Sequence, residues 1–162
     1  MLNSMKRFRN TLLLVLTAWG ATQCQPVGKG ATYLLPNRFV GVVVVAFGRP
    51  MGAPTEYHDG VRVYRIPAGG VLRTQEGATY GLHEPDRYFY VNSQGDVVKS
   101  LPYHSPAGEA SVTFLPTDTI CFNAIPFKND NGLHHYVGVI VGSKAQSDSL
   151  YEVRDKVITH IH

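Results

Sequence analysis

Local catalytic signatures are missing from this 162-residue chain. It has no nucleophile elbow, Walker loop, zincin motif or Cys-x-x-Cys pair, which excludes the enzyme classes that these motifs define. Cysteine itself is scarce, because Cys24 and Cys121 are the only two. A disulfide between them would suit an oxidising compartment, but their spacing does not require it. If Cys24 is acylated or removed, we expect Cys121 to be a small buried hydrophobe between Ile120 and Phe122.

Charge is also low. Charged residues make up 17% of the sequence, and the formal net charge of +3 resides in Lys6, Arg7 and Arg9. Beyond them, the 12 acidic side chains are balanced by an equal number of Lys and Arg. A neutral domain has no electrostatic footprint for nucleic acid or an anionic membrane surface, so both are excluded as direct partners. The 16 Gly and 10 Pro are typical of a loop-rich β protein.

No apolar run approaches the length of about 20 residues that spans a bilayer. Residues 11–18 (TLLLVLTA) are apolar, residues 1–10 carry the basic charges, and small residues follow at Gly20 and Ala21. This order predicts a secretory signal peptide over residues 1–23, and the alternative is a buried N-terminal helix.

Two processing routes remain open. Residues 18–20 (AWG) fit the small-x-small rule of ordinary signal peptidase, which would give a soluble secreted protein. Cys24 lies where a bacterial lipoprotein carries its acylated cysteine, although the residues before it match a lipobox only in part. With acylation at Cys24, residues 24–31 would form a tether to the cell envelope, and residues 32–162 would form a single β-rich domain.

Short strand-like runs separated by Pro and Gly loops fill the mature chain. They are residues 39–47, 61–66, 71–74, 86–91, 96–101, 111–115, 119–122 and 135–141, with a loop expected over 48–59. The continuous apolar run 39–47 predicts a central strand buried on both faces. The runs 86–91 and 96–101 flank a polar turn that ends in Gly95, which predicts a hairpin. The pattern indicates a mainly β fold, either an antiparallel β-sandwich or a partly open barrel.

The period changes near the C-terminus. Apolar residues recur at helical spacing from Leu150 through Val153 and Val157 to Ile161. Ser149 is followed three residues later by Glu152, which is the capping-box pattern. The sequence therefore predicts one C-terminal helix over residues 149–160 that covers an edge or a face of the sheets.

A series of strand and turn motifs runs through residues 31–155. They are Tyr33-Leu34-Leu35-Pro36 with Phe39 and Gly41, Asp59-Gly60, Tyr64-x-Ile66-Pro67-x-x-Gly70-Val71-Leu72-x-Thr74, Tyr88-x-Tyr90-Val91-Asn92 before Gly95, and Val139-Ile140-Val141-Gly142. Together they resemble a family of small exported bacterial proteins that is defined only as a domain of unknown function. The first half also resembles prealbumin-like sandwiches. The resemblance implies export and a β-rich fold, and it supplies no catalytic residue.

The seven histidines are the other candidate functional residues. The adjacent pair at 134–135 would point to opposite faces of a strand, and no pair has metal-ligand spacing, so we expect no metal site. Loop residues could form the site of a small hydrolase if they converge in one cleft. These residues are His58, Asp59, His83, Glu84 and Asp86.

Tyr88 and Tyr90 are the binding residues that the sequence suggests. On a strand they share one face, and Phe89 takes the other. We expect Phe89 to fill the core and the two tyrosines to form an exposed aromatic platform for a sugar or peptide. The alternative is that the tyrosines form cross-strand pairs on a half-exposed face.

The sequence as a whole favours an exported or envelope-anchored protein that binds a protein, peptide or glycan of the cell envelope without catalysis. No cofactor is expected, and membrane contact is expected only through a lipid on Cys24. A small secreted hydrolase is the alternative.

Overall fold

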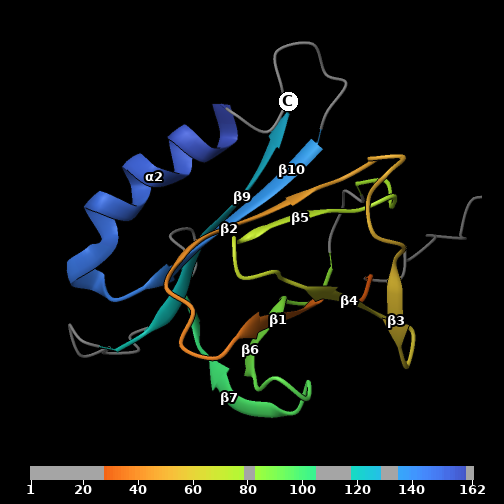
Figure 1. The fold of residues 1–162 in the computed structure, drawn as a ribbon, viewed down its shortest axis with the longest axis horizontal. Coiled ribbons are helices and arrows are strands. Elements are labelled where there is room, and N and C mark those ends of the chain that lie inside the picture. The colour runs from red at the N-terminus through yellow and green to blue at the C-terminus, as the bar shows by residue number, and fades with distance from the viewer. Residues whose placement is uncertain (1–27, 79–82, 105–117, 129–134, 160–162) are drawn as a thin grey trace, which may run out of the picture.

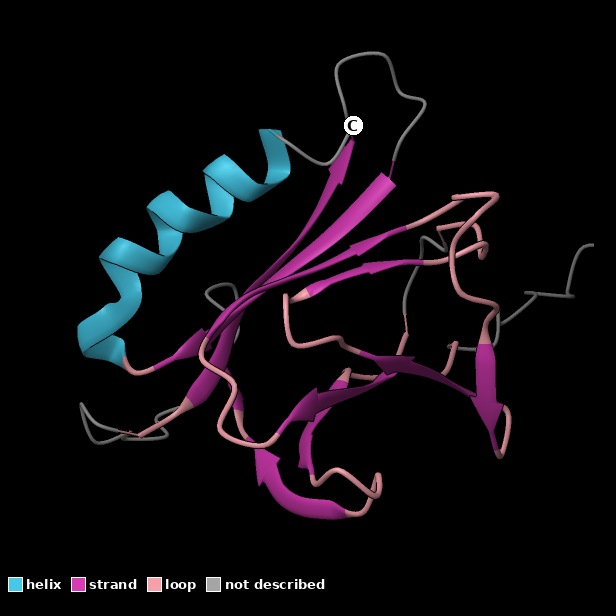
Figure 2. Ribbon diagram, viewed as in Figure 1, coloured by secondary structure: helices cyan, strands magenta, loops and turns pink. Residues whose placement is uncertain are grey.

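A computed structural model describes residues 28–78, 83–104, 118–128 and 135–159 of the chain. Figures 1 and 2 show the strands and the C-terminal helix within these residues. In chain order the elements are β1 (Thr32–Pro36), β2 (Gly41–Ala46), β3 (Glu56–His58), β4 (Val61–Arg65), β5 (Val71–Arg73), β6 (Arg87–Val91), β7 (Val97–Leu101), β8 (Tyr103–His104), β9 (Ile120–Lys128), β10 (His135–Gly142), the 3-10 turn η1 (Lys144–Gln146) and α2 (Ser147–Thr159). The strand expected at 111–115 lies outside the described residues.

The strands form two five-stranded sheets that face each other. One sheet has the order β3-β4-β1-β6-β7, and the other has the order β5-β2-β10-β9-β8. Helix α2 lies on the outer face of the second sheet, on the side away from β1 (Figure 1). The expected mainly β sandwich with one C-terminal helix is therefore confirmed.

The expectation of purely antiparallel pairing is wrong, because both sheets are mixed. β1 is parallel to its neighbours β4 and β6, β2 is parallel to β5, and β8 is parallel to β9. The reason lies in the path of the chain, which enters the other sheet between β1 and β4 and again between β4 and β6. A strand that returns after such a crossover can run parallel to its neighbour, whereas a tight hairpin always gives antiparallel strands.

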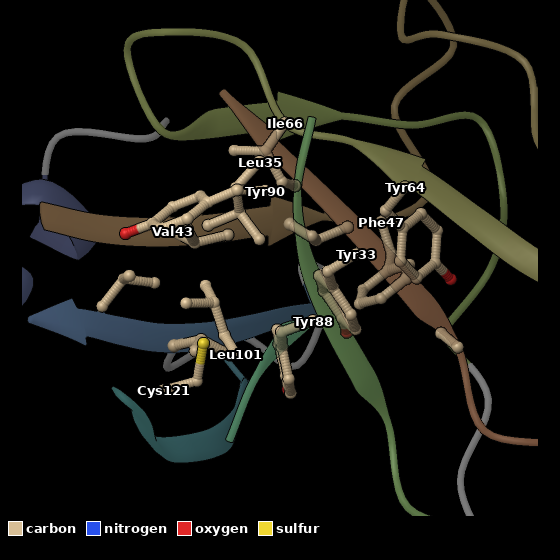
Figure 3. Packing of buried hydrophobic residues seen from close by; sticks show 14 residues of the cluster. Tyr33, Leu35, Val43, Phe47, Tyr64, Ile66, Tyr88, Tyr90, Leu101 and Cys121 are labelled. Carbon is tan, nitrogen blue, oxygen red and sulfur yellow. The ribbon is translucent and has the colours of Figure 1, made fainter. Parts of the chain in front are cut away.

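The main core fills the space between the two sheets (Figure 3). β2 contributes to two cores, since Val43 and Val45 face the first sheet while Val42 and Val44 face α2. The expected central strand with two buried faces is thus confirmed. Cys121 is fully buried beside Leu101 in the main core, and burial raises the pKa of its thiol, as befits a small hydrophobe.

Helix α2 begins two residues before the expected start, and its buried face is rotated from the expected one. Leu150, Tyr151, Val157 and Ile158 pack on the sheet, whereas Val153 is 44% exposed. The cause is Tyr151, whose ring lies 6.0 Å from that of Phe122 on β9. The expected capping box at Ser149 is also wrong: this residue lies inside the helix, and its hydroxyl donates to the carbonyl of Gln146.

Strand β6 alternates as expected but in the opposite phase. Tyr88 and Tyr90 are only 2% and 5% exposed, whereas Phe89 is half-buried on the outer face. The ring of Tyr88 stacks on that of Tyr33 at 4.8 Å, inside the sandwich (Figure 3). The hydroxyl of Tyr90 reaches the edge of the core and donates to the carbonyl of Phe39. The exposed platform expected at Tyr88 and Tyr90 is therefore wrong, because β6 turns both rings toward the other sheet, where Tyr88 stacks on Tyr33 and Tyr90 keeps a hydrogen bond for its hydroxyl.

Because Tyr88 points inward and Phe89 outward, truncating Tyr88 should destabilise the fold more than truncating Phe89, which is the reverse of the expectation from the sequence. Tyr88→Ala should lower the free energy of unfolding by about 3 to 5 kcal/mol, because it removes a buried ring, and Phe89→Ala should lower it by less. Urea denaturation measures both. Tyr88→Phe is the matched control: the Tyr88 hydroxyl is buried without a hydrogen-bond partner among the described residues, so its removal should not destabilise the fold. A larger loss for Phe89→Ala than for Tyr88→Ala would contradict this placement.

Candidate functional site

The outer face of the β3-β4-β1-β6-β7 sheet carries a row of half-buried apolar side chains. Leu34, Val63, Phe89 and Val91 share this face, and none of the described elements packs over it. The opposite outer surface of the sandwich is covered by α2 (Figure 2). Large apolar side chains on an uncovered face are typical of contact surfaces, so this sheet face is a candidate binding surface.

A groove of about 720 Å³ lies at one end of this sheet. It is formed where three parallel strands end, and the lining residues are Leu34, Pro36 and Asn37 from β1, Arg65 and Ile66 from β4, and Val91 to Gly95 from β6 and the turn after it. Its size is that of a small-molecule or short-peptide site. Its walls combine an apolar floor with polar side chains and backbone on the rim, which is the composition of binding sites in general.

Local hydrogen bonds fix the rim of the groove. The amide of Asn37 donates to the carbonyl of Val91 at 3.0 Å, which ties the end of β1 to the end of β6. In the β6–β7 turn, the side-chain Oδ1 of Asn92 accepts from the amides of Gln94 and Asp96. Gly95 closes this turn with φ = 90°, a conformation that favours glycine. The rim is therefore set before any ligand arrives.

Arg65 supplies the charge of the groove. Among the described lining residues it is the one ionised side chain, and its Nε donates to Oε2 of Glu56 on β3 at 2.8 Å. Both side chains are about half exposed, at 55% and 50%. The ion pair therefore adds little stability but fixes the direction in which the guanidinium points.

A second polar cluster joins β3 and β4 to the segment after β5. The carboxylate of Glu76 accepts from the hydroxyls of Tyr57 at 3.2 Å and Tyr64 at 3.0 Å, and Nε of Arg62 lies 3.8 Å from it. Burial raises the pKa of the Tyr64 hydroxyl, so this group stays protonated and keeps donating. The Glu76 carboxylate therefore already has three partners within the protein. This cluster links β3 and β4 to the segment after β5 and is structural.

The loop histidines and acids lie at the other end of β1 from the groove. His58 approaches its neighbour Asp59 at 3.4 Å, and His83 Nδ1 lies 2.7 Å from the carbonyl oxygen of Glu84. Asp86 is half-buried and accepts from the amide of Ala31 at 2.7 Å. Within the residues that the structure describes, no three His, Cys, Asp or Glu side chains are placed to hold a metal ion.

The residues that line the groove differ from the site residues expected from the sequence. Tyr88 and Tyr90 are interior, and the loop residues engage their own neighbours. The groove residues, Arg65 above all, were not expected as a site. A signal was present in the strand ends, since Leu35-Pro36-Asn37, Arg65-Ile66-Pro67 and Val91-Asn92 each finish a strand with a residue that stops pairing or turns the chain.

The family model described as "Family of unknown function (DUF6843)" matches residues 28–120, which is more than half of the chain. The chain belongs to DUF6843. The matched region contains β1 to β8 and every groove residue, whereas β10 and α2 lie beyond it. The groove is therefore part of the DUF6843 region itself, and the expected membership of an uncharacterised family is confirmed.

Other comparisons add little. A solved structure named "Putative Lipoprotein" from Bacillus anthracis is 18% identical, covers 74% of this chain and 77% of its own, and has a TM-score of 0.49. Similarity at this level does not transfer a function. No curated protein matches the chain. In the part of the chain that the structure describes, no helix is long and apolar enough to cross a membrane.

Asp86 allows a test of the end opposite the groove. Burial raises the pKa of its carboxyl, while the hydrogen bond from Ala31 and the nearby His83 lower it. Asp86→Ala should lower the free energy of unfolding by about 1 to 3 kcal/mol, because the buried Ala31 amide loses its acceptor. Asp86→Asn keeps an acceptor oxygen and should be tolerated.

The raised pKa also fixes a pH dependence. The folded state of the wild type holds the Asp86 proton more tightly than the unfolded state, so this residue contributes less stability as pH rises from about 3.9 through the folded pKa. Asp86→Asn lacks this loss. Its stability relative to the wild type should therefore rise over that window and then stay constant, as measured by thermal melts from pH 3 upward. A relative stability that falls with pH would show that the folded pKa is lowered instead.

Proposed function

We propose that the protein is exported, is anchored to the cell envelope by a lipid on Cys24, and binds an extended ligand without chemistry in the groove at the ends of β1, β4 and β6. The observation that carries this proposal is the groove itself, with its apolar floor and fixed polar rim on an uncovered sheet face. The sequence contributes the signal-peptide pattern before Cys24.

The end of the sandwich at which the described chain begins supports the same proposal. The described chain is held from Gly28 onward, because Gly28 pairs with His83 and its carbonyl accepts from the amide of Glu84 at 2.8 Å. Gly30 packs so closely on residues 84–85 that a Cβ there would lie 2.4 Å from the Glu84 carbonyl oxygen. A lipid on Cys24 would therefore keep this end within about 14 Å of the bilayer, four residues at full extension.

The groove would then point away from the membrane. β1 runs from this anchored end toward Pro36, and β4 and β6 run parallel to it. All three carboxyl ends meet at the groove, so tether and groove occupy opposite ends of one sheet.

The alternative of a small hydrolase finds less support. Its candidate residues lie at the anchored end, where His58 is highly exposed beside Asp59 and His83 meets a backbone carbonyl. The buried Cys121 is not placed as a nucleophile, because burial raises the pKa of its thiol and keeps it protonated.

Cys24→Ser tests the anchor. In the cells that make the protein, this variant should move from the membrane fraction to the soluble exported fraction, and its mass should lose the lipid. Immunoblotting of the two fractions and mass spectrometry measure the change. Gln25→Ser, next to the proposed acylation site, is the control that should stay with the membrane. Equal partition of Cys24→Ser and wild type would mean that no lipid on Cys24 holds the chain.

Val91→Arg tests the groove. A long charged side chain at the end of β6 should occupy the groove and displace its ligand, with little effect on the thermal melt because Val91 faces outward. Val61→Arg makes the same change on the same outer face at the anchored end of β4. After crosslinking on intact cells, Val61→Arg and wild type should recover the same envelope component, and Val91→Arg should lose it. Recovery by all three proteins would remove the groove from the function.

A further inference from the structure

Arg65 lines the groove with most of its hydrogen-bonding capacity unused. Glu56 takes the Nε donor. The two Nη groups have no partner among the described residues, and Nη1 lies 3.7 Å from the position that a Cβ on Gly95 would occupy. The guanidinium therefore lies beside the β6–β7 turn with its outer N–H groups available to a ligand in the groove.

The two Nη groups of a guanidinium are spaced to bind a ligand group that carries two neighbouring oxygens. Their parallel N–H donors bind the two oxygens of a carboxylate or phosphate side by side. Glu56 bonds only the Nε side of the guanidinium, which orients the planar group with its Nη edge free of Glu56. The other lining residues are uncharged, so recognition of a charged ligand group in the groove falls to the guanidinium edge that Glu56 leaves unpaired.

The floor of the groove decides between a peptide and a polar polymer. Leu34, Pro36 and Val91 are half-buried and present apolar surface beside Arg65, whereas Ile66 lines the groove from the core with only 5% of its surface exposed. A polyol phosphate chain would cover this floor with hydroxyl groups and gain nothing from it. A peptide supplies an apolar side chain for the floor, backbone groups for the Asn and Gln side chains on the rim, and a carboxylate for Arg65.

We propose that the groove binds an extended peptide whose carboxylate pairs with the Nη edge of Arg65 and whose neighbouring apolar side chain lies on Leu34, Ile66 and Val91. Arg65 is the binding residue, and Glu56 is a positioning residue that acts through it. This inference rests on the proposed binding function and gives it a ligand class. The carboxylate can be the C-terminus of a peptide or an Asp or Glu side chain, because both offer the same two oxygens.

The test uses the full-length chain with Cys24→Ser, so that it is soluble, and three hexapeptide libraries on beads. The first has free C-termini and no acidic residues, the second is the same library amidated, and the third is amidated with one internal Asp or Glu. Fluorescently labelled protein should select sequences from the first or the third library and none from the second. The library that is selected tells which source of carboxylate the groove accepts.

Selected peptides are then titrated against variants. Arg65→Gln should weaken binding at least tenfold, Arg65→Lys should restore part of it, and Glu56→Gln should weaken it less than Arg65→Gln because the charge remains but its orientation is lost. Arg87→Gln is the matched control, since Arg87 is an exposed arginine on the same outer face at the anchored end. It should change the affinity by less than twofold, with equal thermal melts for all four variants.

Three results would overturn the proposal: selection from the amidated neutral library as strong as from the others, equal losses for Arg65→Gln and Arg87→Gln, or no selection from any library. If instead polyglycerol phosphate binds and Val91→Arg abolishes that binding, the peptide is the wrong ligand but the groove still binds. If the groove binds no ligand at all, a different experiment shows it: Val91→Arg and wild type then crosslink to the same envelope component on intact cells.

Discussion

The parallel pairing of β1 with both of its neighbours is the constraint from which the rest of the molecule follows. Because β4 and β6 run in the same direction as β1, the sheet acquires two unlike ends. At the amino ends the described chain begins at Gly28, which pairs with His83, and Gly30 packs on residues 84–85. At the carboxyl ends the residues that follow β1, β4 and β6 line the groove. In a strictly antiparallel sheet, amino ends and carboxyl ends of strands would alternate at both ends of the sheet.

Such pairing requires the chain to change sheets repeatedly, and both sheets contribute aromatic rings to the core between them. Tyr33 and Tyr88 stack at 4.8 Å, and Tyr88 stacks on Tyr103 from the other sheet at 5.5 Å. The hydroxyls of Tyr64 and Tyr90 keep hydrogen-bond partners, to Glu76 and to the carbonyl of Phe39, while their rings are buried. Burial raises the pKa of Tyr90 to about 12, which keeps its hydroxyl a donor at any physiological pH.

Features that depend on neighbouring residues could be predicted from the sequence, and features that depend on distant pairing could not. The hairpin around Asn92–Gly95, the doubly buried β2 and the C-terminal helix are local, and all three are present. The small hairpin of β3 and β4 is also local, since Asp59-Gly60 is a strong turn signal with φ of 51° and 72°, although the Pro and Gly residues before it predict a loop where β3 lies. The inward phase of Tyr88 and the groove arise from parallel neighbours far away in sequence, which no local pattern reports.

For the same reason, the sequence neighbours of Arg65 do not identify it as a binding residue. In sequence it is one charge on an alternating strand, equivalent to Arg62 three residues before it. The fold makes them different: Arg62 lies on the inward side near the carboxylate of Glu76, while Arg65 lies outward at the strand end. There Glu56 from β3 and the glycine turn after β6 meet beside it. Its proposed role comes from that meeting of three strands, because an arginine that is held but not neutralised on its outer edge is prepared for a ligand that the protein itself does not provide.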